Sequence, residues 1–248
     1  MNVTQKFLKL IVLFFILGNV AFAQVTQLNY KAKFGMFGTV GNIKNTLTQN
    51  AKTYQIKTRV TLSGMAKSIL GGQTEEYISK GHMEDGLMVS DFYKMTTRKK
   101  ETIITKEYTI NHANKRITKK YEKWTRGKLV KEYTQKLNFY AKDDLLTLYF
   151  NLGKAIPKTG KTYKFRAVGL EKQQGKVEIV VPQKRQLKKY KKDLGEHATL
   201  YAKALIYQKN FRKKKGDILL AVGDDGFIKK AVIKDILLFG DAQLIRVK

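Results

Sequence analysis

The sequence contains no cysteine among its 248 residues. This absence excludes disulfide bonds, a thiol nucleophile and a thiolate metal site. Proline, tryptophan and histidine are also scarce, with two, one and three residues respectively. No serine nucleophile elbow, His-Glu-x-x-His motif or glycine-rich phosphate-binding loop is present. We therefore expect a protein that is not an enzyme and that binds no cofactor.

Long hydrophobic runs are missing after residue 23, whereas residues 1–23 resemble a signal peptide. Lys6 and Lys9 flank the start of an apolar run that is too short to cross a bilayer as a helix. Ala21-Phe22-Ala23 then matches the small-x-small pattern of a cleavage site. We expect cleavage before Gln24 and an exported protein, periplasmic or alternatively secreted, with no transmembrane segment after cleavage. An uncleaved N-terminal membrane anchor is the alternative.

Acidic residues are few, since 20 Asp and Glu face 49 Lys and Arg, for a net charge of +29 at pH 7. Such a charge favours anionic partners, or simply a well-solvated surface. Export makes nucleic acid the least expected partner, and lipid head groups or acidic polysaccharide better candidates. Basic clusters at expected turns and strand ends could gather on one rim of the fold or stay dispersed. The candidate basic surface comprises Lys184, Arg185, Lys188, Lys189, Lys191, Lys192, Arg212, Lys213, Lys214 and Lys215.

Most of residues 24–248 alternate between apolar and polar side chains, as strands with one buried face do. The clearest run is Tyr54 to Leu62, and Asp224-Asp225-Gly226 is a strong hairpin turn. The spacing predicts about 12 to 14 strands, and no linker divides them. We expect a single all-β domain over 24–248, whose large curved antiparallel sheet forms a barrel-like or two-layer structure.

One stretch breaks the strand pattern. Between Asp143 and Leu152 the apolar residues recur at helical spacing, and Gly153 follows where a helix could end. The Asp143-Asp144 pair suits the first turn, where a carboxylate can cap free amides. We expect this amphipathic helix to act as a lid or plug on the inner side of the sheet. Its candidate contact residues are Leu145, Leu148, Tyr149 and Leu152. A second, short helix or turn is predicted between Gly64 and Leu70.

Few residues suggest chemistry. His82 lies close to Glu84 and Asp85 in the sequence, but we interpret this group as a solvated turn rather than a metal site, because a metal needs three or four convergent ligands. His112 and His197 are expected to be exposed. The acid pairs at 75–76, 143–144 and 224–225 are adjacent in sequence, so they do not predict a convergent catalytic pair.

Asp91 is an irregularity, because it occupies an apolar position in the alternation of Leu87 to Met95. It could point inward, or a β-bulge could place Phe92 on the core face instead.

Several short motifs resemble the bacterial exported-protein family known as domain of unknown function 3108. They are the first strand with Tyr30 and then Gly35 and Gly38, the strand Leu87 to Met95, the run Lys142 to Tyr149, Gly160 to Tyr163, and C-terminal hairpins over 218–222, 224–225, 227–233 and 239–240. Ile228-Lys229-Lys230 departs from that family's Leu-Pro pattern. The resemblance implies an all-β, barrel-like exported domain and supplies no catalytic residues.

Two functions follow from these expectations. The first is a non-enzymatic β-barrel-like protein of the cell envelope that binds an apolar or amphiphilic ligand, such as lipid, on its concave face. The second is a structural or assembly factor that binds an envelope protein or an acidic glycan through its basic surface. The abundance of aromatic residues, 13 Tyr and 13 Phe, serves either a packed core or a cavity lining.

Overall fold

A computed structural model describes residues 23–69, 72–157, 160–206, 216–236 and 240–247. The leader expected at residues 1–23 lies outside the described residues except for its last position, and so does the basic cluster at 212–215. Within the described ranges, none of the helices combines the length and the hydropathy needed to cross a bilayer.

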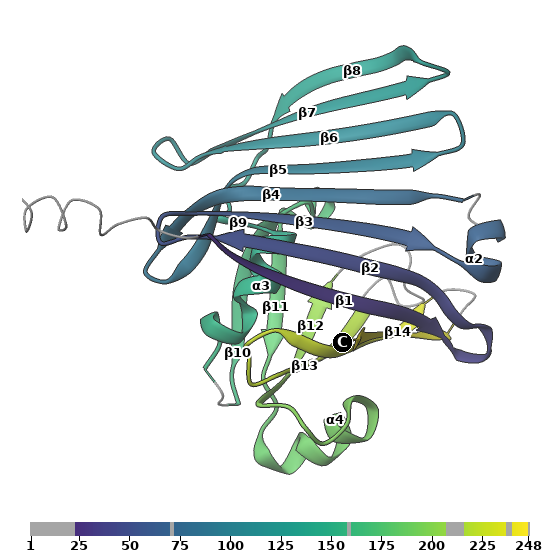
Figure 1. Cartoon of the computed structure of the whole chain (residues 1–248). Helices are drawn as coiled ribbons and strands as arrows, with labels where there is room; N and C mark the ends of the chain where they lie inside the picture. Colours follow the sequence, from purple (N-terminus) through teal and green to yellow (C-terminus); the bar gives the residue numbers. More distant parts are fainter. Residues whose placement is uncertain (1–22, 70–71, 158–159, 207–215, 237–239, 248) are drawn as a thin grey trace, which may run out of the picture.

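Strands dominate the chain (Figure 1). The N-terminal strands are β1 Gln24–Phe34, β2 Gly38–Gln49, β3 Thr53–Leu62, β4 Thr74–Glu84, β5 Leu87–Lys99, β6 Thr102–Asn111, β7 Arg116–Thr125 and β8 Lys128–Lys136. The C-terminal strands are β9 Asp143–Asp144, β10 Thr162–Val168, β11 Lys176–Val180, β12 Leu200–Ile206, β13 Gly216–Val222, β14 Ile228–Ile236 and β15 Gly240–Val247. The helices are α2 Gly64–Ile69, α3 Leu145–Ala155 and α4 Leu187–Leu194, with 3-10 turns η1 Gly35–Phe37, η2 Glu171–Gln173 and η3 Lys184–Gln186.

All of these strands belong to one 15-stranded sheet in the order β8-β7-β6-β5-β4-β3-β2-β1-β15-β14-β13-β12-β11-β10-β9. Two antiparallel meanders, β1–β8 and β10–β15, meet where β1 pairs with β15. Among the described strands, only the two-residue strand β9 pairs in parallel, with β10. Neighbours in sequence are therefore neighbours in the sheet almost everywhere, as hairpin-rich sequences favour.

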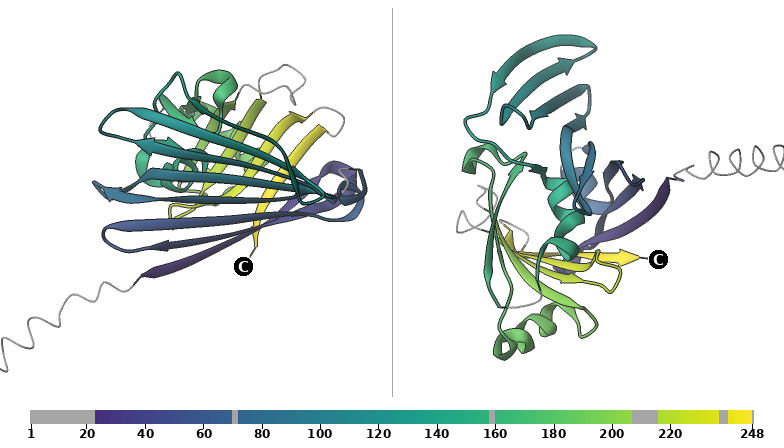
Figure 2. Two further views of the ribbon diagram at one scale, coloured as in Figure 1. Left: turned by 90° about the horizontal axis from the view of Figure 1, so that it is seen from above. Right: turned by 90° about the vertical axis from the view of Figure 1, so that its left-hand side faces the viewer.

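The sheet curls around α3 but does not close (Figure 2). Its two edges, β8 and β9, are consecutive in the sequence, so residues 137–142 cross from one edge to the other. Curling is expected, because a strongly twisted sheet of this many strands must bend, split or close. The predicted all-β class with a large curved sheet and an amphipathic helix is confirmed.

Helix α3 packs against both halves of the sheet. Leu148 and Leu152 join a core cluster formed with β10–β14, while Phe150 joins a second cluster with Leu47 and Ile56 of β2 and β3. All three helix side chains are at most 5% exposed. Burying large apolar side chains of this kind contributes about 1.5–3 kcal/mol each, so α3 forms the centre of the core.

The helix also extends further than predicted. Gly153 does not end it, because α3 continues to Ala155. A Cβ atom at Gly153 would lie 2.2 Å from the carbonyl oxygen of Gly226. This glycine therefore serves close approach between the helix and the β13–β14 turn rather than helix termination.

The basic run at 184–192 was not predicted to be helical, but it forms η3 and α4. Leu187, Tyr190 and Leu194 pack against a cluster with Leu219 and Val232 of β13 and β14. The intervening lysines face solvent. Because the apolar stripe consists of only three large residues among these lysines, it is difficult to detect in the sequence.

Asp144 fastens α3 to the N-terminal half of the sheet. Its Oδ1 accepts hydrogen bonds from the amides of Leu146 (2.7 Å) and Thr147 (3.0 Å), which makes it the N-cap residue. Its Oδ2 accepts from the hydroxyls of Ser79 on β4 (2.5 Å), Ser90 on β5 (2.6 Å) and Thr147 (2.9 Å). The predicted capping role of the acid pair is thus confirmed for Asp144, which is 0% exposed.

The hydroxyl protons around Asp144 can all be placed. Ser79, Ser90 and Thr147 each donate their one proton to the carboxylate, which leaves Tyr54 of β3 to donate to Thr147 at 2.8 Å or Ser79 at 3.0 Å. Burial raises the pKa of Asp144, and the hydrogen bonds from the serines and Thr147 oppose that rise. Three strands and one helix therefore share one buried polar network.

Replacing Asp144 with Ala should lower the free energy of unfolding by about 3 kcal/mol or more. The change removes the helix cap and leaves buried hydroxyls and amides without an acceptor, and each loss costs about 1 kcal/mol or more. Urea unfolding followed by far-UV circular dichroism measures the effect. A cost below about 1 kcal/mol would contradict the central role assigned to this carboxylate.

Replacing Asp143 should have the opposite effect on the free energy of unfolding at high pH. Burial first, and the neighbouring Asp144 charge second, raise the pKa of Asp143 from 3.8 to about 7. A carboxyl of this kind contributes its full stabilisation when the pH is below its pKa in the unfolded chain. That contribution is lost as the pH rises through its pKa in the folded protein. Asp143→Asn should therefore change stability little at pH 4 and increase the free energy of unfolding by about 1–3 kcal/mol at pH 8. Denaturation of both proteins across this range tests the sign, and equal pH profiles would contradict it.

Candidate functional site

A pocket of about 250 Å³ lies between the concave face of the sheet and the first turn of α3. Its sheet wall comes from β1–β5 and β15, and its helix wall from Leu145, Leu146 and Tyr149. Two of the four predicted lid residues, Leu145 and Tyr149, thus line a cavity, whereas Leu148 and Leu152 are buried in the core. The fold brings these residues together because α3 starts directly beneath β4 and β5, where Asp144 anchors it.

The polar groups in the pocket wall are mostly satisfied by other protein groups. Thr58 donates to Asn45 Oδ1 at 2.7 Å, and Asn45 donates to the Leu28 carbonyl at 2.9 Å. Tyr30 donates to the Ile228 carbonyl at 2.8 Å, and Tyr77 donates to Glu75. The lining that remains is predominantly apolar, which suits an apolar ligand group better than a polar one.

The concave face continues from this pocket to the free edge of the sheet. Strand register places Tyr77, Met95, Lys106, Tyr121 and Tyr133 in one row across β4 to β8. The rings of Tyr121 and Tyr133 stack at a centroid distance of 4.8 Å. Since neighbouring strands lie about 4.8 Å apart, Lys106 is about 10 Å from the pocket residue Tyr77. The apolar pocket therefore shares its face of the sheet with a set of tyrosine and lysine side chains on β6 to β8, which we call the trough.

The next row of this face carries two further lysines, Lys123 and Lys131, on β7 and β8. The Lys131 ammonium lies 5.6 Å from the Tyr133 ring centroid. In the described part of the chain, neither these lysines nor Lys106 pairs with a carboxylate. Three ammonium groups on this face are thus free for an anionic partner.

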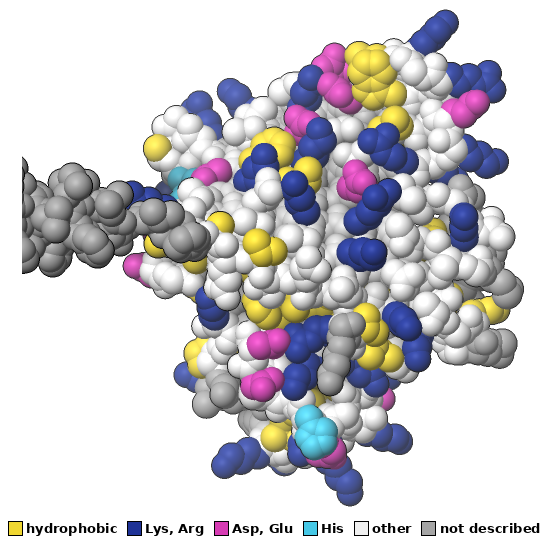
Figure 3. All heavy atoms as spheres, viewed as in Figure 1, with side chains coloured by type: hydrophobic (Ala, Val, Ile, Leu, Met, Phe, Trp, Pro, Cys, Tyr) yellow, Lys and Arg dark blue, Asp and Glu magenta, His cyan; other side chains and the backbone are white. Residues whose placement is uncertain are grey.

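The convex face has a different charge pattern. Lys94 pairs with Glu107 at 2.6 Å, and Lys120 pairs with Glu132 at 2.9 Å. On the face shown in Figure 3, Lys and Arg side chains are spread over the strands and interspersed with Asp and Glu. Such exposed pairs contribute little stability, about 0–1 kcal/mol each, but they offset part of the positive charge of the convex surface.

Glu171 of η2 contacts the N-terminal meander on the open side of the curled sheet. It accepts a hydrogen bond from Tyr108 of β6 and lies 2.9 Å from Lys119 of β7. Burial alone would raise the pKa of Glu171, but the hydrogen bonds from Tyr108 and Lys119 outweigh it and hold the pKa below its ordinary value. This carboxylate links the two meanders on the side where the sheet stays open.

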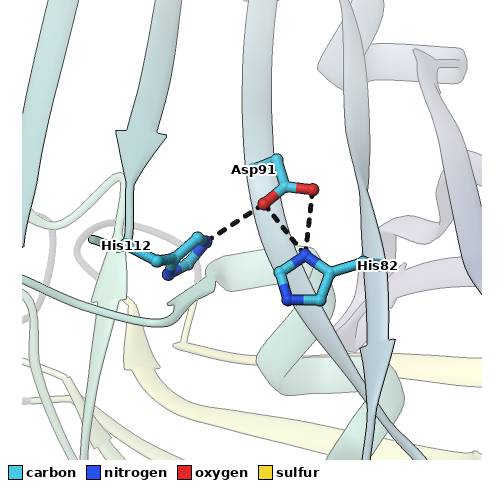
Figure 4. A group of neighbouring side chains, drawn as sticks. All are labelled: His82, Asp91 and His112. Carbon is cyan, nitrogen blue, oxygen red and sulfur yellow. Dashed lines mark hydrogen bonds and ion pairs between the residues drawn. The ribbon is translucent and has the colours of Figure 1, made fainter.

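A second cluster brings His82, Asp91 and His112 together (Figure 4). His82 Nδ1 lies 3.0 Å from both carboxylate oxygens of Asp91. His112 Nε2 lies 3.1 Å from Asp91 Oδ1 and 3.0 Å from the Ser90 carbonyl. Its other nitrogen, Nδ1, lies 2.7 Å from the hydroxyl of Tyr140. Both imidazoles therefore point at one carboxylate.

A β-bulge positions this cluster. Lys80 pairs with Phe92 and Gly81 with Ser90, so Asp91 is the extra residue of β5. Pairing between β5 and β6 begins only at Phe92, so the β6–β7 turn, which contains His112, leaves the ladder there. The Ser90 carbonyl would otherwise lack a ladder partner, and His112 occupies it.

These contacts correct three predictions. His82 lies in β4 rather than in a solvated turn with Asp85, and it contacts Asp91 across the strand pair. The bulge alternative for Asp91 is confirmed, but Tyr93, 1% exposed, faces the core instead of Phe92. His112 is partly buried rather than exposed, with 25% of its side chain accessible. His197 is exposed as expected.

Of the candidate basic surface, residues 184–192 lie on η3 and α4, which cover the β13–β14 side of the C-terminal half sheet. Lys191 pairs with Glu196 at 2.8 Å, and the remaining lysines and Arg185 are exposed. The cluster at 212–215 lies outside the described residues, so whether the two groups meet stays a prediction.

Comparison with known proteins supports the fold alone. The chain is similar to the crystal structure of a β-barrel-like protein of domain of unknown function DUF1849 from Brucella abortus, with a TM-score of 0.54 and 9% sequence identity over 93% of this chain and 98% of that one. No family model and no curated protein matches the chain.

The resemblance to domain of unknown function 3108 is therefore wrong. No family model supports it, and the similar solved structure carries a different family designation. Two of the motifs that suggested it have local causes: Asp144 caps a helix, and residues 224–225 lie in the hairpin turn between β13 and β14. Many antiparallel folds need such residues, so these motifs do not identify a family.

The geometry fixes the imidazole tautomers. The Asp91 carboxylate and the Ser90 carbonyl can only accept protons, so at pH 8 we expect His82 to carry its proton on Nδ1 and His112 on Nε2. Side-chain ¹⁵N NMR distinguishes the tautomers, with the exposed His197 as the reference. Tyr140→Phe should leave the His112 tautomer unchanged, because Ser90 and Asp91 still hold it. A proton on His112 Nδ1 in the wild-type protein would contradict this arrangement.

Proposed function

We propose that the protein is an exported, non-enzymatic binder of an anionic amphiphile, such as a lipid with a single acyl chain in contact with the protein. The observation that carries the proposal is the pocket of about 250 Å³ between α3 and the concave face. Its volume lies just below the range typical of whole small-molecule sites, about 300–1,000 Å³, so it suits part of a ligand. The acyl portion would contact Leu145, Leu146 and Tyr149.

The lysines of the trough support an anionic head group. Lys106, Lys123 and Lys131 lie on the same face as the pocket and have no carboxylate partner among the described residues, whereas Lys94 and Lys120 of the convex face pair with glutamates. A head group at Lys106 would be about 10 Å from Tyr77, a distance that a short stretch of acyl chain spans. Polar and apolar contacts would thus fix both orientation and affinity.

A second candidate function uses the surface of α4. Lys188, Lys189 and Lys192 are exposed and point away from the stripe that packs on the sheet. This basic helix would suit an acidic envelope protein or glycan. Binding there would not involve the pocket, so mutations in the pocket distinguish the two functions.

Filling the pocket should weaken ligand binding. We expect Val60→Phe to reduce the affinity for a fluorescent long-chain fatty acid by about tenfold or more, because the larger ring occupies space that the acyl chain needs. Ile78→Phe is the matched control, since Ile78 lies on the convex face of the adjacent strand. Equal affinity of the wild-type protein and Val60→Phe would exclude the pocket as the site.

Removing the trough charges should weaken binding more at low salt than at high salt. The double variant Lys106→Ala/Lys131→Ala should lose about three- to tenfold in affinity for the fatty acid. Lys57→Ala/Lys80→Ala makes the same charge change on the convex face and should have little effect. Similar losses in both double variants would point to net charge alone.

A further inference from the structure

We propose that His82, Asp91 and His112 form a binding site for a divalent transition metal ion. The three side chains come from β4, from the bulge of β5 and from the β6–β7 turn, and one donor atom of each lies within 4.8 Å of the others. The proposal does not depend on the amphiphile pocket.

The donor set determines the class of ion. Two imidazole nitrogens and one carboxylate oxygen suit Zn²⁺, Co²⁺, Ni²⁺ or Cu²⁺, whereas Mg²⁺ and Ca²⁺ prefer oxygen ligands throughout. A tetrahedral ion about 2.0–2.1 Å from each donor requires donors about 3.3 Å apart. The two nitrogen–oxygen distances to Asp91, 3.0 and 3.1 Å, are close to this value, and all three donor atoms lie within 4.8 Å of one another.

The backbone holds the donors independently of a metal. The bulge fixes the position of Asp91. The neighbouring Ser90 is held by two hydrogen bonds, one from its backbone amide to the Lys142 carbonyl (3.0 Å) and one from its hydroxyl to the Asp144 carboxylate (2.6 Å). His112 is held from behind by Tyr140. A preformed site of this kind loses little conformational entropy when the ion binds.

Tyr140 supplies the outer contact that metal-binding histidines usually have. A metal on His112 Nε2 requires the ring proton to move to Nδ1, which then donates to the Tyr140 hydroxyl at 2.7 Å. The Ser90 carbonyl gives up its bond to His112 in exchange. On His82 the proton moves from Nδ1 to Nε2, so binding changes both tautomers.

The site would keep open coordination positions. The side chains of His82 and Asp91 are 42% and 46% exposed, and that of His112 is 25% exposed. Three protein ligands therefore leave at least one position for water or for a ligand group. The ion would exchange with the solvent, unlike the ion of a closed structural site.

Titration of the tag-free, chelator-treated protein with Co²⁺ and Zn²⁺ tests the site. We expect one ion per chain, visible as Co²⁺ absorption bands and by calorimetry. His82→Asn and Asp91→Asn should each weaken Zn²⁺ binding by more than tenfold, and Tyr140→Phe by roughly tenfold. His197→Asn, a change at an exposed histidine elsewhere, should have no effect.

NMR of the wild-type protein tests the site without any substitution, so unfolding of a variant cannot affect the result. Zn²⁺ should shift the side-chain nitrogens of His82 and His112 and invert their tautomers, while His197 stays unchanged. The proposal would be overturned by the absence of saturable Zn²⁺ binding, by unchanged His82 and His112 signals, or by full Zn²⁺ affinity of a folded His82→Asn variant.

Discussion

One buried carboxylate sets the position of the helix on which the inner surface depends. Asp144 is fully buried and receives five hydrogen bonds from β4, β5 and the first turn of α3. An acceptor with so many donors can be replaced only at a high free-energy cost. The pocket residues Leu145 and Leu146 follow it directly in sequence, so the same contacts that start the helix also place the pocket wall.

The two faces of the N-terminal meander show how a strongly basic protein distributes its charge. On the convex side, Lys94 and Lys120 pair with glutamates, whereas Lys57 and Lys80 have no carboxylate partner among the described residues. On the concave side, lysines alternate with tyrosines, and only Lys119 has a carboxylate partner in the described region, Glu171. Part of the positive charge of the chain therefore lies on the concave face, on the same side of the sheet as the pocket.

Local patterns sufficed to predict most of the strands and α3, because both depend on residues close in sequence. They failed for α4, whose apolar stripe of Leu187, Tyr190 and Leu194 is short and surrounded by lysines. They also failed for the histidine cluster, since His82 and His112 meet only through the pairing of β4, β5 and β6. The bulge at Asp91 left a visible break in the alternation, and that break was the one available signal.

The strand order has a consequence for how the chain reaches its native state. In the described sheet, consecutive strands are neighbours except for β8 and β9, which form its two edges. The one pair of strands distant in sequence is β1 with β15, with Tyr30 opposite Arg246. Contact order is therefore low within each meander and very high at this single seam. Two locally folding units would form first, and the late, slow event would be the docking of one meander onto the other along β1 and β15.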